Sequence, residues 1–495
     1  MWVSSAITAL QIAALLPQTQ ALAVRSPQVP ISKRDDGNTT LRPGFPHPDP
    51  TESYWQEPPH RIANLRTTPE LPTEETFDYV IVGSGVSGAA IAFKLLSRDP
   101  SLSILMLEAR TAASAASGRN GGHCKAGDWK AVKEWVELYG EDEALRIGKM
   151  EQDCVDDVRE FVRAHNVSSG WQDVETADVY WTKEAFEKAT GIVEYQKELQ
   201  SRRPNDGPWS NKRTVYAGQA ARDYWKWPQI LGAVVYTAHT QNPYLTVCAI
   251  LEEGLNKGLN LQTNTVALAL NQLSSASETG AKWEVETDRG TVKGKQVVLA
   301  TNSYTNALHP GLASTGFLTP QRAQVAAVHP EKDTSNNTVF RRSHSYPDLH
   351  SGNNYIAVRA PGDIGAGDVI IGGSSKFSPT RERNITDDSV INQDMADDLR
   401  AVGRVVFGYE NWGETTKVVK DWTGIICNTP DGFPVVGGLP GQDGLWASVC
   451  MNGHGMAWAY RSAEALVQMM TEGEAPEWFP QSFDVARAWN KSSDS

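Results

Sequence analysis

The clearest apolar run of the chain begins at residue 77. Residues 77–82 read FDYVIV, which is typical of a strand buried on both faces. Gly83, Gly85 and Gly88 follow directly, and a helix-like segment starts near Val86. The next apolar run, SLSILMLEAR, predicts a second buried strand that ends at Glu108, 20 residues beyond Gly88. Strand, glycines, helix, strand and acid therefore occur within one unit.

This unit has the mechanical features of a dinucleotide-binding turn. Gly83 permits the tight turn, Gly85 lets the backbone approach a pyrophosphate, and Gly88 lets the helix pack closely on the strand. Glu108 stands where a carboxylate binds a ribose hydroxyl, and an acid at this position argues against the 2′-phosphate of NADP. We therefore predict dinucleotide binding; the alternative is a glycine turn that arose by chance.

Later apolar runs predict more strands on the same sheet. They read NLQTNTVALAL, which contains Val266, then the hairpin-like KWEVETDRGTVKG, then KQVVLATNSYT, which ends at Ala300, Thr301 and Asn302. Near the C-terminus, DGLWASVCMNGHGMAWAYRSAEALVQMM predicts a strand, a glycine turn and an amphipathic helix. Strand ends on one edge of an open sheet are where a cofactor lies. No internal repeat is present.

Two elements favour FAD over NAD. A loop rich in small residues, TAASAASGRNGGHCKAG, follows the acid and can lie along a ribityl chain and flavin ring. The helix after NGHGM can aim its N-terminus at the flavin pyrimidine edge, where reduction places negative charge. A mobile surface loop and an ordinary strand-to-helix turn are the alternatives. The predicted cofactor-binding residues are Gly83, Ser84, Gly85, Val86, Ser87, Gly88, Glu108, Ala109, Arg110, Ser117, Arg119, Asn120, Gly121, Gly122, His123, Val266, Ala300, Thr301, Asn302, Asn452, Gly453, His454, Gly455 and Met456.

Composition narrows the partners. The chain has 495 residues, 40% of them hydrophobic, and a net charge of -13, which disfavours a nucleic-acid partner. The five cysteines have neither CxxC nor His-rich spacing, so no metal site is predicted. We expect a small-molecule substrate, no nucleic acid and no stable membrane span.

The N-terminus has features of secretion. Residues 1–23 resemble a signal peptide that ends in small residues, although a basic start is missing. A short membrane anchor and a frayed helix are the alternatives. Residues 24–75 are rich in Pro and polar residues and predict a propeptide or flexible arm, with a dibasic pair at Lys33 and Arg34. Five sequons would permit glycosylation, at Asn38, Asn166, Asn336, Asn384 and Asn490. We expect a secreted or secretory-pathway glycoprotein.

Taken together, VIVGSGVSG…LEAR, SGRNGGH, WTGIICNTPDGFPVVGGLPG and NGHGM resemble the FAD oxidoreductase superfamily of D-amino-acid oxidase and of glycine and sarcosine oxidases. They look most like its gamma-glutamylputrescine-oxidase-like branch, common in fungi and bacteria. The resemblance covers residues 76–475 and implies an α/β protein. Its Rossmann-like FAD-binding domain is discontinuous (76–125, 226–305 and 416–476), an α+β substrate domain with a mixed or antiparallel sheet is inserted (126–225 and 306–415), and 477–495 form a C-terminal tail.

The resemblance also bears on how FAD is attached. In the monomeric sarcosine oxidase branch, a cysteine seven residues before the Asp of a Pro-Asp pair is bonded to the flavin. Counting back from Asp431 gives Gly424, and Cys427 is out of register. Non-covalent FAD is therefore expected, with His123 and Cys427 as candidates for any covalent link.

The family further implies oxidation of a carbon–nitrogen bond by hydride transfer to flavin N5, with dioxygen as the electron acceptor. Arg322, Tyr355 and His454 are the candidate catalytic residues: Arg322 to hold a substrate carboxylate, Tyr355 to wall the pocket, His454 at the flavin edge. The alternatives are a structural ion pair, core packing and a purely backbone role. Three other functions stay open: a tailoring flavin oxidase acting on a larger natural product, a non-catalytic flavin-binding secreted protein, and an NAD-dependent dehydrogenase.

Overall fold

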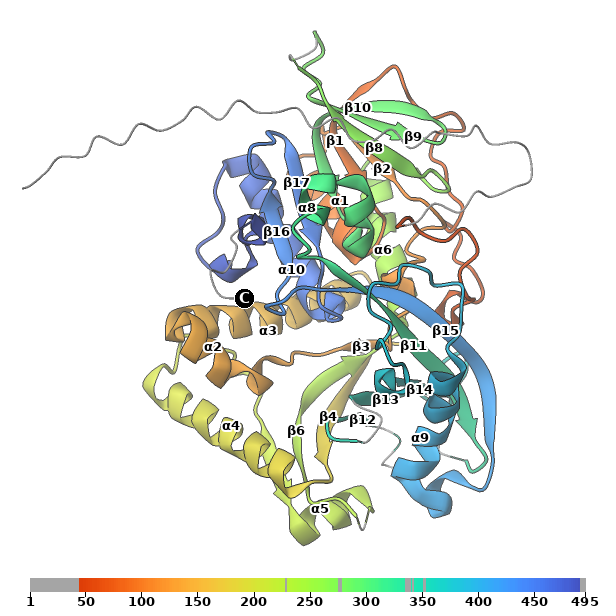
Figure 1. Cartoon of the computed structure of the whole chain (residues 1–495), viewed down its shortest axis with the longest axis vertical. Coiled ribbons are helices and arrows are strands. Elements are labelled where there is room, and N and C mark those ends of the chain that lie inside the picture. The colour runs from red at the N-terminus through yellow and green to blue at the C-terminus, as the bar shows by residue number, and fades with distance from the viewer. Residues whose placement is uncertain are drawn as a thin grey trace, which may run out of the picture. The chain divides into compact units, whose positions relative to one another are not determined.

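The computed structural model describes residues 44–227, 229–274, 278–333, 340, 342–349 and 353–489. Within these ranges the strands form two sheets, of eight and nine strands. The first lies in the upper part of Figure 1 and the second in the lower part. The predicted signal peptide, the dibasic pair and the sequons at Asn38, Asn336 and Asn490 lie outside the described residues.

The first sheet is the predicted dinucleotide-binding sheet. Its main path is β16 (Val435–Gly438), β17 (Leu445–Val449), β10 (Gly290–Leu299), β1 (Thr76–Val82), β2 (Ile104–Leu107) and β7 (Asn260–Gln262), and β8 (Ala267–Gln272) and β9 (Trp283–Thr287) extend it beside β10. Along this path the strands from β17 to β7 pair in parallel, whereas β16 pairs antiparallel with β17 and β9 pairs antiparallel with β10 and β8. The helices that pack beside it are α1 (Val86–Arg98), α6 (Pro243–Asn256) and α10 (Gly455–Glu472), with α3 (Glu141–Ala164) against α10.

The second sheet is mixed. Its order is β15 (Thr416–Asn428), β11 (Thr319–Pro330), β14 (Val369–Gly372), β13 (Asn354–Val358), β12 (Ser343–Tyr346), β4 (Gln172–Tyr180), β6 (Gly232–Thr240) and β3 (His123–Cys124), with β5 (Thr214–Ala217) beside β6. The β12–β4 pair is parallel and the other pairs are antiparallel. The remaining helices are α2 (Val132–Tyr139), α4 (Lys183–Arg202), α5 (Gly218–Trp225), α7 (Thr305–Leu308), α8 (Pro310–Ala313) and α9 (Gln393–Trp412).

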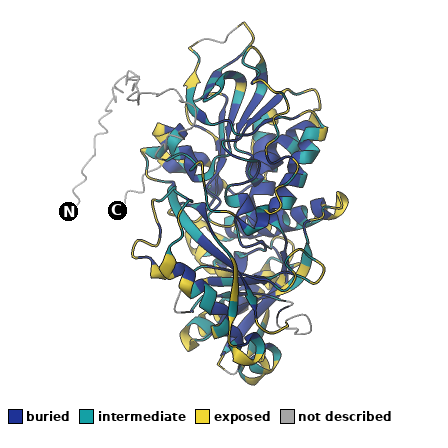
Figure 2. Ribbon diagram, turned by 90° about the vertical axis from the view of Figure 1, so that its right-hand side faces the viewer, coloured by how far each residue is buried: buried dark blue, intermediate teal, exposed yellow. Residues whose placement is uncertain are grey.

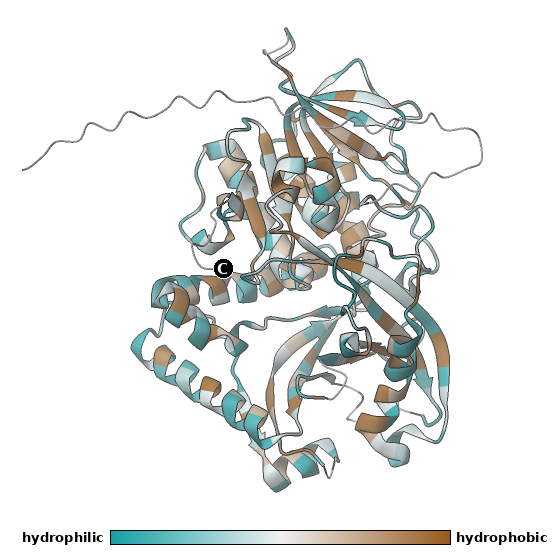
Figure 3. Ribbon diagram, viewed as in Figure 1, coloured by the Kyte–Doolittle hydropathy of each residue, from teal (hydrophilic) through white to brown (hydrophobic). Residues whose placement is uncertain are grey.

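Hydropathy explains which strands lie at the centre. Residues 79–82 of β1 and all four residues of β2 are buried, because helices cover the sheet. The strands of both sheets are mostly dark blue in Figure 2, and in Figure 3 the exposed helix α4, at the lower left, is teal along most of its length.

None of the helices within the described ranges has the length and apolar content needed to cross a membrane.

These observations confirm the α/β fold class, with a Rossmann-like sheet and a second, mixed sheet. The sheets divide the chain differently from the expected segments, however. β3, β6 and β15 fall in segments that we predicted for the FAD-binding domain, yet they belong to the second sheet. Both sheets lie in one unit, Leu41–Ser495.

The described part of the predicted arm and the predicted C-terminal tail both pack against the core. Trp55 and Ile62 of the predicted arm are 2% and 6% exposed. In the predicted tail Phe483 is fully buried, and Arg487 Nε lies 2.7 Å from Asp431 Oδ2. Pro-rich composition was misleading here, because a segment with few apolar residues can still be ordered by anchoring them in an existing core.

Candidate functional site

The glycine turn after β1 is as tight as the sequence predicts. Gly83 has a φ of +106°, and its N–H donates to Leu107 O at 2.8 Å. A Cβ on Gly88 would lie 1.9 Å from Gly83 O, and one on Gly85 would lie 3.1 Å from Ser117 Oγ. Close packing therefore excludes larger residues at Gly88, and the first turn of α1 begins at this point with its N–H groups directed out of the helix.

Glu108 lies at the end of β2 and is bound to the turn. Its Oε2 accepts hydrogen bonds from Ser84 N at 3.0 Å and from Ser84 Oγ at 2.6 Å, and its Oε1 accepts one from Arg110 N at 2.9 Å. The carboxylate is therefore fixed beside the glycine turn, where an acid can bind a ribose.

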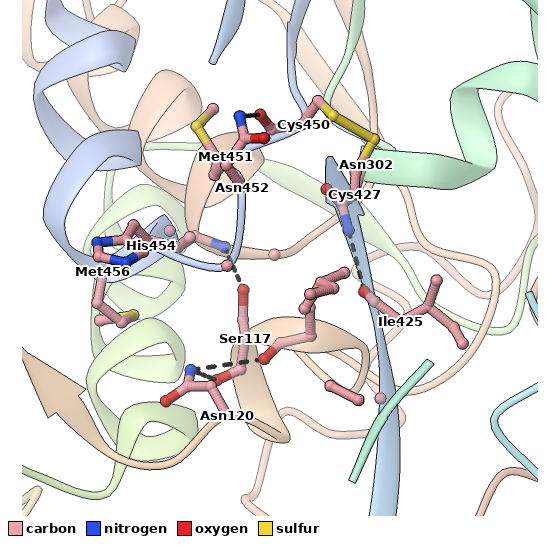
Figure 4. A pocket seen from close by; sticks show the side chains of 18 of the residues that line it. Ser117, Asn120, Asn302, Ile425, Cys427, Cys450, Met451, Asn452, His454 and Met456 are labelled. Atoms are coloured by element: carbon pink, nitrogen blue, oxygen red, sulfur yellow. Dashed lines mark hydrogen bonds between the residues drawn. A yellow bond between two sulfur atoms is a disulfide. The ribbon is translucent and has the colours of Figure 1, made fainter. Parts of the chain in front are cut away.

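The small-residue loop after Glu108 folds back over the start of α1. Ser117 Oγ accepts a hydrogen bond from Val86 N at 2.8 Å, and Asn120 Nδ2 donates to Ser117 O at 3.0 Å (Figure 4). The Arg119 guanidinium donates to Ser114 O at 2.7 Å and to Thr423 O at 2.9 Å. Burial lowers the pKa of Arg119 to about 10. The loop is thus an ordered part of the site and not a mobile surface loop.

The residues before β1 hold this loop in place. Trp55 Nε1 donates to Asn120 O at 2.6 Å, Ser53 Oγ donates to Gly118 O at 2.7 Å, and Gln56 Nε2 donates to the same oxygen at 2.9 Å. The structure therefore corrects the expectation of a flexible arm for the described part of residues 24–75. The residues that follow Gly44 clamp the loop and contribute Phe45 and Pro46 to the cavity wall.

A single cavity of about 870 Å³ joins the glycine turn to the second sheet. Of the predicted cofactor-binding residues, all but Ser84, Gly88 and Gly122 line it. Those three residues lie behind the residues that line the cavity and support them. Ser84 holds Glu108, Gly88 packs against Gly83 O, and at Gly122 (φ +80°) a Cβ would lie 2.7 Å from Gln241 O. In Figure 4 His454 at the N-cap of α10 and Met456 in its first turn lie opposite the strand that carries Ile425 and Cys427.

His454 is the N-cap residue of α10, and its side chain is 50% exposed. Its Nδ1 lies 3.3 Å from Oε1 of the buried Glu151 on α3. The ring is thus held at the cavity wall by a carboxylate from a helix more than 300 residues earlier.

Cys427 and Cys450, both in the cavity wall, form a disulfide (Figure 4). The bond joins β15 of the second sheet to the end of β17 in the first, directly before the NGHGM turn. The sulfur of Cys427 is therefore not free for a link to FAD. His123, the other candidate, lies edge-on to the Tyr355 ring at a centroid distance of 5.6 Å. Burial and the nearby Lys125 lower its pKa well below the usual value.

Tyr355 lies in a slot formed by two glycines. A Cβ on Gly121 would lie 2.1 Å from Tyr355 Cε2, and one on Gly372 would lie 2.1 Å from Tyr355 Cζ. Burial raises the pKa of Tyr355, so its hydroxyl is protonated at neutral pH. The ring fits its predicted place as a wall of the pocket.

Arg322 is not in place to hold a substrate. Residues of a strand alternate between its faces, and Ala323 and Val325 of β11 line the cavity. Arg322 is on the opposite face, where its Nε donates to Glu382 Oε2 at 2.6 Å. Arg322 therefore forms a structural ion pair with Glu382, which is the alternative that the sequence analysis left open.

Lys125 was missed by the sequence reasoning, although it stands two residues after His123. It lines the cavity and donates from Nζ to Ser345 Oγ at 2.7 Å. A lysine next to a glycine-rich loop carries no signal of its own, because the partner strand lies more than 200 residues later.

The polar groups of the wall fit FAD. Within the described residues, the Tyr304 hydroxyl and Nε and Nη2 of Arg110 are buried without a hydrogen-bond partner, and both residues line the cavity. Buried polar atoms are rarely left unpaired, so these atoms suit a polar ligand. With the glycine turn and Glu108, they define a dinucleotide site that continues into a second chamber under the mixed sheet.

Comparison with known proteins agrees with this class of site. A family model described as DAO, FAD dependent oxidoreductase, matches residues 78–469. The chain belongs to this family, and it is an FAD-dependent oxidoreductase.

Individual relatives are distant. The probable oxidoreductase OrdL of Haemophilus influenzae is 24% identical over 249 residues, a match that covers 48% of this chain and about half (52%) of the relative. The glycine oxidase of Geobacillus kaustophilus has a TM-score of 0.65 at 17% identity and covers 83% of this chain and 99% of its own. The L-proline dehydrogenase of P. horikoshii has a TM-score of 0.61 at 16% identity, with coverages of 85% and 99%. At these identities the structural likeness concerns the fold.

Proposed function

We propose that this protein oxidises the carbon–nitrogen bond of an amine or amino acid with FAD, and that dioxygen accepts the electrons. The observation that carries the proposal is the continuity of the cavity, which runs from the glycine turn of the first sheet to Tyr355 on the second. One chamber can thus hold both a dinucleotide and a small molecule, as such a reaction needs. Bound FAD would supply the chemistry by accepting a hydride at N5.

The protein's own contribution is binding, orientation and exclusion of water. The glycine turn and Glu108 would hold the adenine end, and the Ser117–Asn120 loop and the α10 N-terminus would hold the flavin end. Tyr355 and Trp129 present aromatic walls to the substrate chamber. Such walls desolvate the reacting bond and limit its orientation. No side chain has to act as a general base if the substrate enters as a neutral amine.

The finer assignment is also a proposal. The motifs favour the gamma-glutamylputrescine-oxidase-like branch of the family. The structural relatives include both an oxidase and a dehydrogenase, so we base dioxygen as acceptor on the family resemblance alone. Non-covalent attachment of FAD is supported by the disulfide that occupies Cys427.

We also propose that the protein enters the secretory pathway. The N-terminal sequence carries the argument, and two facts are compatible with it: Asn166 and Asn384, both in sequons, are exposed, and Cys427 is paired with Cys450. Glycosidase treatment of protein collected from the culture medium should increase its gel mobility. Purely intracellular, unglycosylated protein would contradict this part.

The central proposal is tested by the absorption spectrum of the purified protein. We expect a flavin band that leaves with the supernatant after acid denaturation, and bleaching of that band when an amine or amino acid is added without oxygen. Peroxide release in air then tests dioxygen as the acceptor. A bound flavin that no simple amine or amino acid reduces would favour a tailoring oxidase or a non-catalytic protein instead.

A further inference from the structure

Part of the cavity lining is apolar and lies under the second sheet, away from the glycine turn. We call it the apolar wall, and its members are Trp129, Tyr180, Ala185, Ala189 and Ile192. Trp129 comes from the turn after the small-residue loop, Tyr180 from β4 and the other three from α4. All five belong to, or pack against, one hydrophobic cluster, whose other buried members are Val193, Val234 and Tyr236. The apolar wall is therefore anchored in a core on one side and faces the cavity on the other.

Helix α4 turns one face toward the cavity. Ala185, Lys188, Ala189 and Ile192 stand at positions i, i+3, i+4 and i+7, so they share a face of the helix. Lys188 is exposed, whereas Ala189 is buried, so this face extends from the solvent to the core. The two alanines leave space next to the buried rings of Trp129 and Tyr180, and a larger residue at either position would take it.

The apolar wall has no partner for a charged group. Burial raises the pKa of Tyr180, so its hydroxyl stays neutral. Among the described residues that line the cavity, Glu108 is the only carboxylate, and it lies at the glycine turn. The buried Asp178, behind the lining, is already paired with Lys130 Nζ at 2.7 Å and accepts a hydrogen bond from Tyr236 OH at 3.0 Å. An ammonium group placed against this wall would lose water without gaining a counter-charge.

An apolar ligand group, in contrast, would gain from the apolar wall. Each methylene group that leaves water for such a surface strengthens binding by about fourfold. The Trp129 and Tyr180 rings add flat contact area on two sides of the space. Binding energy from a part of a ligand that does not react can hold its reacting part in place.

We propose that the apolar wall binds an alkyl or aryl arm of the substrate. The enzyme would then act on amines or amino acids that carry one large apolar group, and would discriminate against small amines and polyamines. This inference rests on the proposed function for the reaction, whereas the apolar site is defined by the five residues alone.

The first experiment measures binding without turnover. The probes are 1,1-dimethylalkylamines of increasing chain length, because the carbon next to their nitrogen has no hydrogen to transfer. Each probe is titrated into the FAD-loaded protein by calorimetry. We expect the affinity to rise about fourfold for each added methylene group from the tert-butyl to the dimethylhexyl member. Affinity that does not depend on chain length would overturn the proposal.

The second experiment fills the space beside the apolar wall. In Ala185→Phe a ring enters the cavity from α4, at a position that is only partly buried and should tolerate it. The longest probe should bind at least about tenfold more weakly, and tert-butylamine should bind as in wild type. The matched control is Glu187→Phe, which changes a 66%-exposed residue of α4 that does not line the cavity. Unchanged affinity for the longest probe in Ala185→Phe would overturn the proposal. If this variant does not fold, the chain-length series on the wild type decides.

The third experiment compares octylamine with the diamine of the same length, by flavin reduction without oxygen. The concentration for half-maximal reduction should be at least about tenfold higher for the diamine, because its second ammonium group would lie against the apolar wall. Equal concentrations would overturn the proposal. If amines reduce the flavin with no effect of chain length, the proposed function stands and the apolar-wall proposal fails. If no amine or amino acid reduces it while probe binding still depends on chain length, the apolar site stands and the proposed function fails.

Discussion

The two ends of the cavity are built in different ways. At the nucleotide end, Gly83, Ser84, Gly88 and Glu108 come from one short stretch and contact one another directly. The substrate end is formed by residues from four separate parts of the second sheet: Lys125 directly after β3, Thr176 in β4, Ser345 in β12 and Tyr355 in β13. The first end is a local motif with little freedom to vary, whereas the second exists only because distant strands share a sheet. Substitutions at the nucleotide end should therefore weaken binding of FAD. Substitutions at the substrate end should lower substrate affinity or the reaction rate while FAD stays bound.

The largest effect is expected at Gly88. In Gly88→Val the new side chain would begin 1.9 Å from Gly83 O, so the turn must open. We expect flavin content, measured as the ratio of flavin to protein absorbance, to fall by at least about tenfold, as overpacking at backbone contact is not relieved by side-chain movement. Gly191→Ala in α4 is the control, because nothing lies within 4 Å of its added Cβ. Full flavin content in Gly88→Val would contradict the account of the turn.

The next effect is a loss of stability, and it tests whether Arg322 supports the fold or binds the substrate. Arg322→Met leaves the buried Glu382 without its ion-pair partner. Removing one member of a buried pair costs about 3 kcal/mol of unfolding free energy, measured by urea denaturation. Glu382→Gln in the same variant should recover part of this loss. The affinity of the FAD-loaded protein for benzoate, a simple carboxylate, should stay within about threefold of wild type, and a large loss would return Arg322 to the role that the sequence suggested.

The disulfide ties the two ends together. Breaking it with Cys427→Ser opens a loop with a sequence separation of 23, which predicts a loss of about 3 kcal/mol in the chain-entropy treatment. A reducing agent should lower the melting temperature of the wild type and leave that of the variant unchanged. Cys248→Ala controls for removal of a buried thiol, since Cys248 is unpaired. Equal sensitivity of wild type and variant to the reductant would show that the bond does not form.

The smallest effect is expected where the shape of the Tyr355 slot changes. In Gly372→Ala the added Cβ would lie 2.1 Å from Tyr355 Cζ and OH, so the ring must move within the chamber. We expect full flavin content and a fall in kcat/KM of about tenfold, because a small displacement of a substrate wall misaligns the reacting bond. Tyr355→Phe keeps the ring and should change kcat/KM by less than about threefold. Loss of flavin in Gly372→Ala would break the separation between the two ends.

Most of the residues that the sequence predicted for the nucleotide end line the cavity. Three residues that we predicted to bind the cofactor do not line the cavity but lie directly behind the residues that do: Ser84, Gly88 and Gly122. At the other end the prediction was poorer. Tyr355 and His454 line the cavity, whereas Arg322, which we predicted to hold a substrate carboxylate, lies on the other face of its strand. Lys125 was overlooked. The face of Arg322 depends on the pairing of β11 with β15, and no pattern near residue 322 reveals it.

The segment before the first strand shows the same limit in another way. Its composition indicated a flexible arm, and its few large residues, such as Trp55, are what anchor it to the Asn120 loop. Composition averages over a segment, whereas packing depends on single side chains that find a matching surface.

By itself, the sequence determined the fold class and the glycine turn after β1, because strand, glycines, helix and acid interact over about 30 residues. The later SGRNGGH and NGHGM motifs then indicated FAD as the cofactor. The tertiary structure decided which strands form the roof of the chamber, which cysteines pair and which lysines line the cavity. Those outcomes depend on contacts between residues hundreds of positions apart, and only the folded sheet brings them within bonding distance.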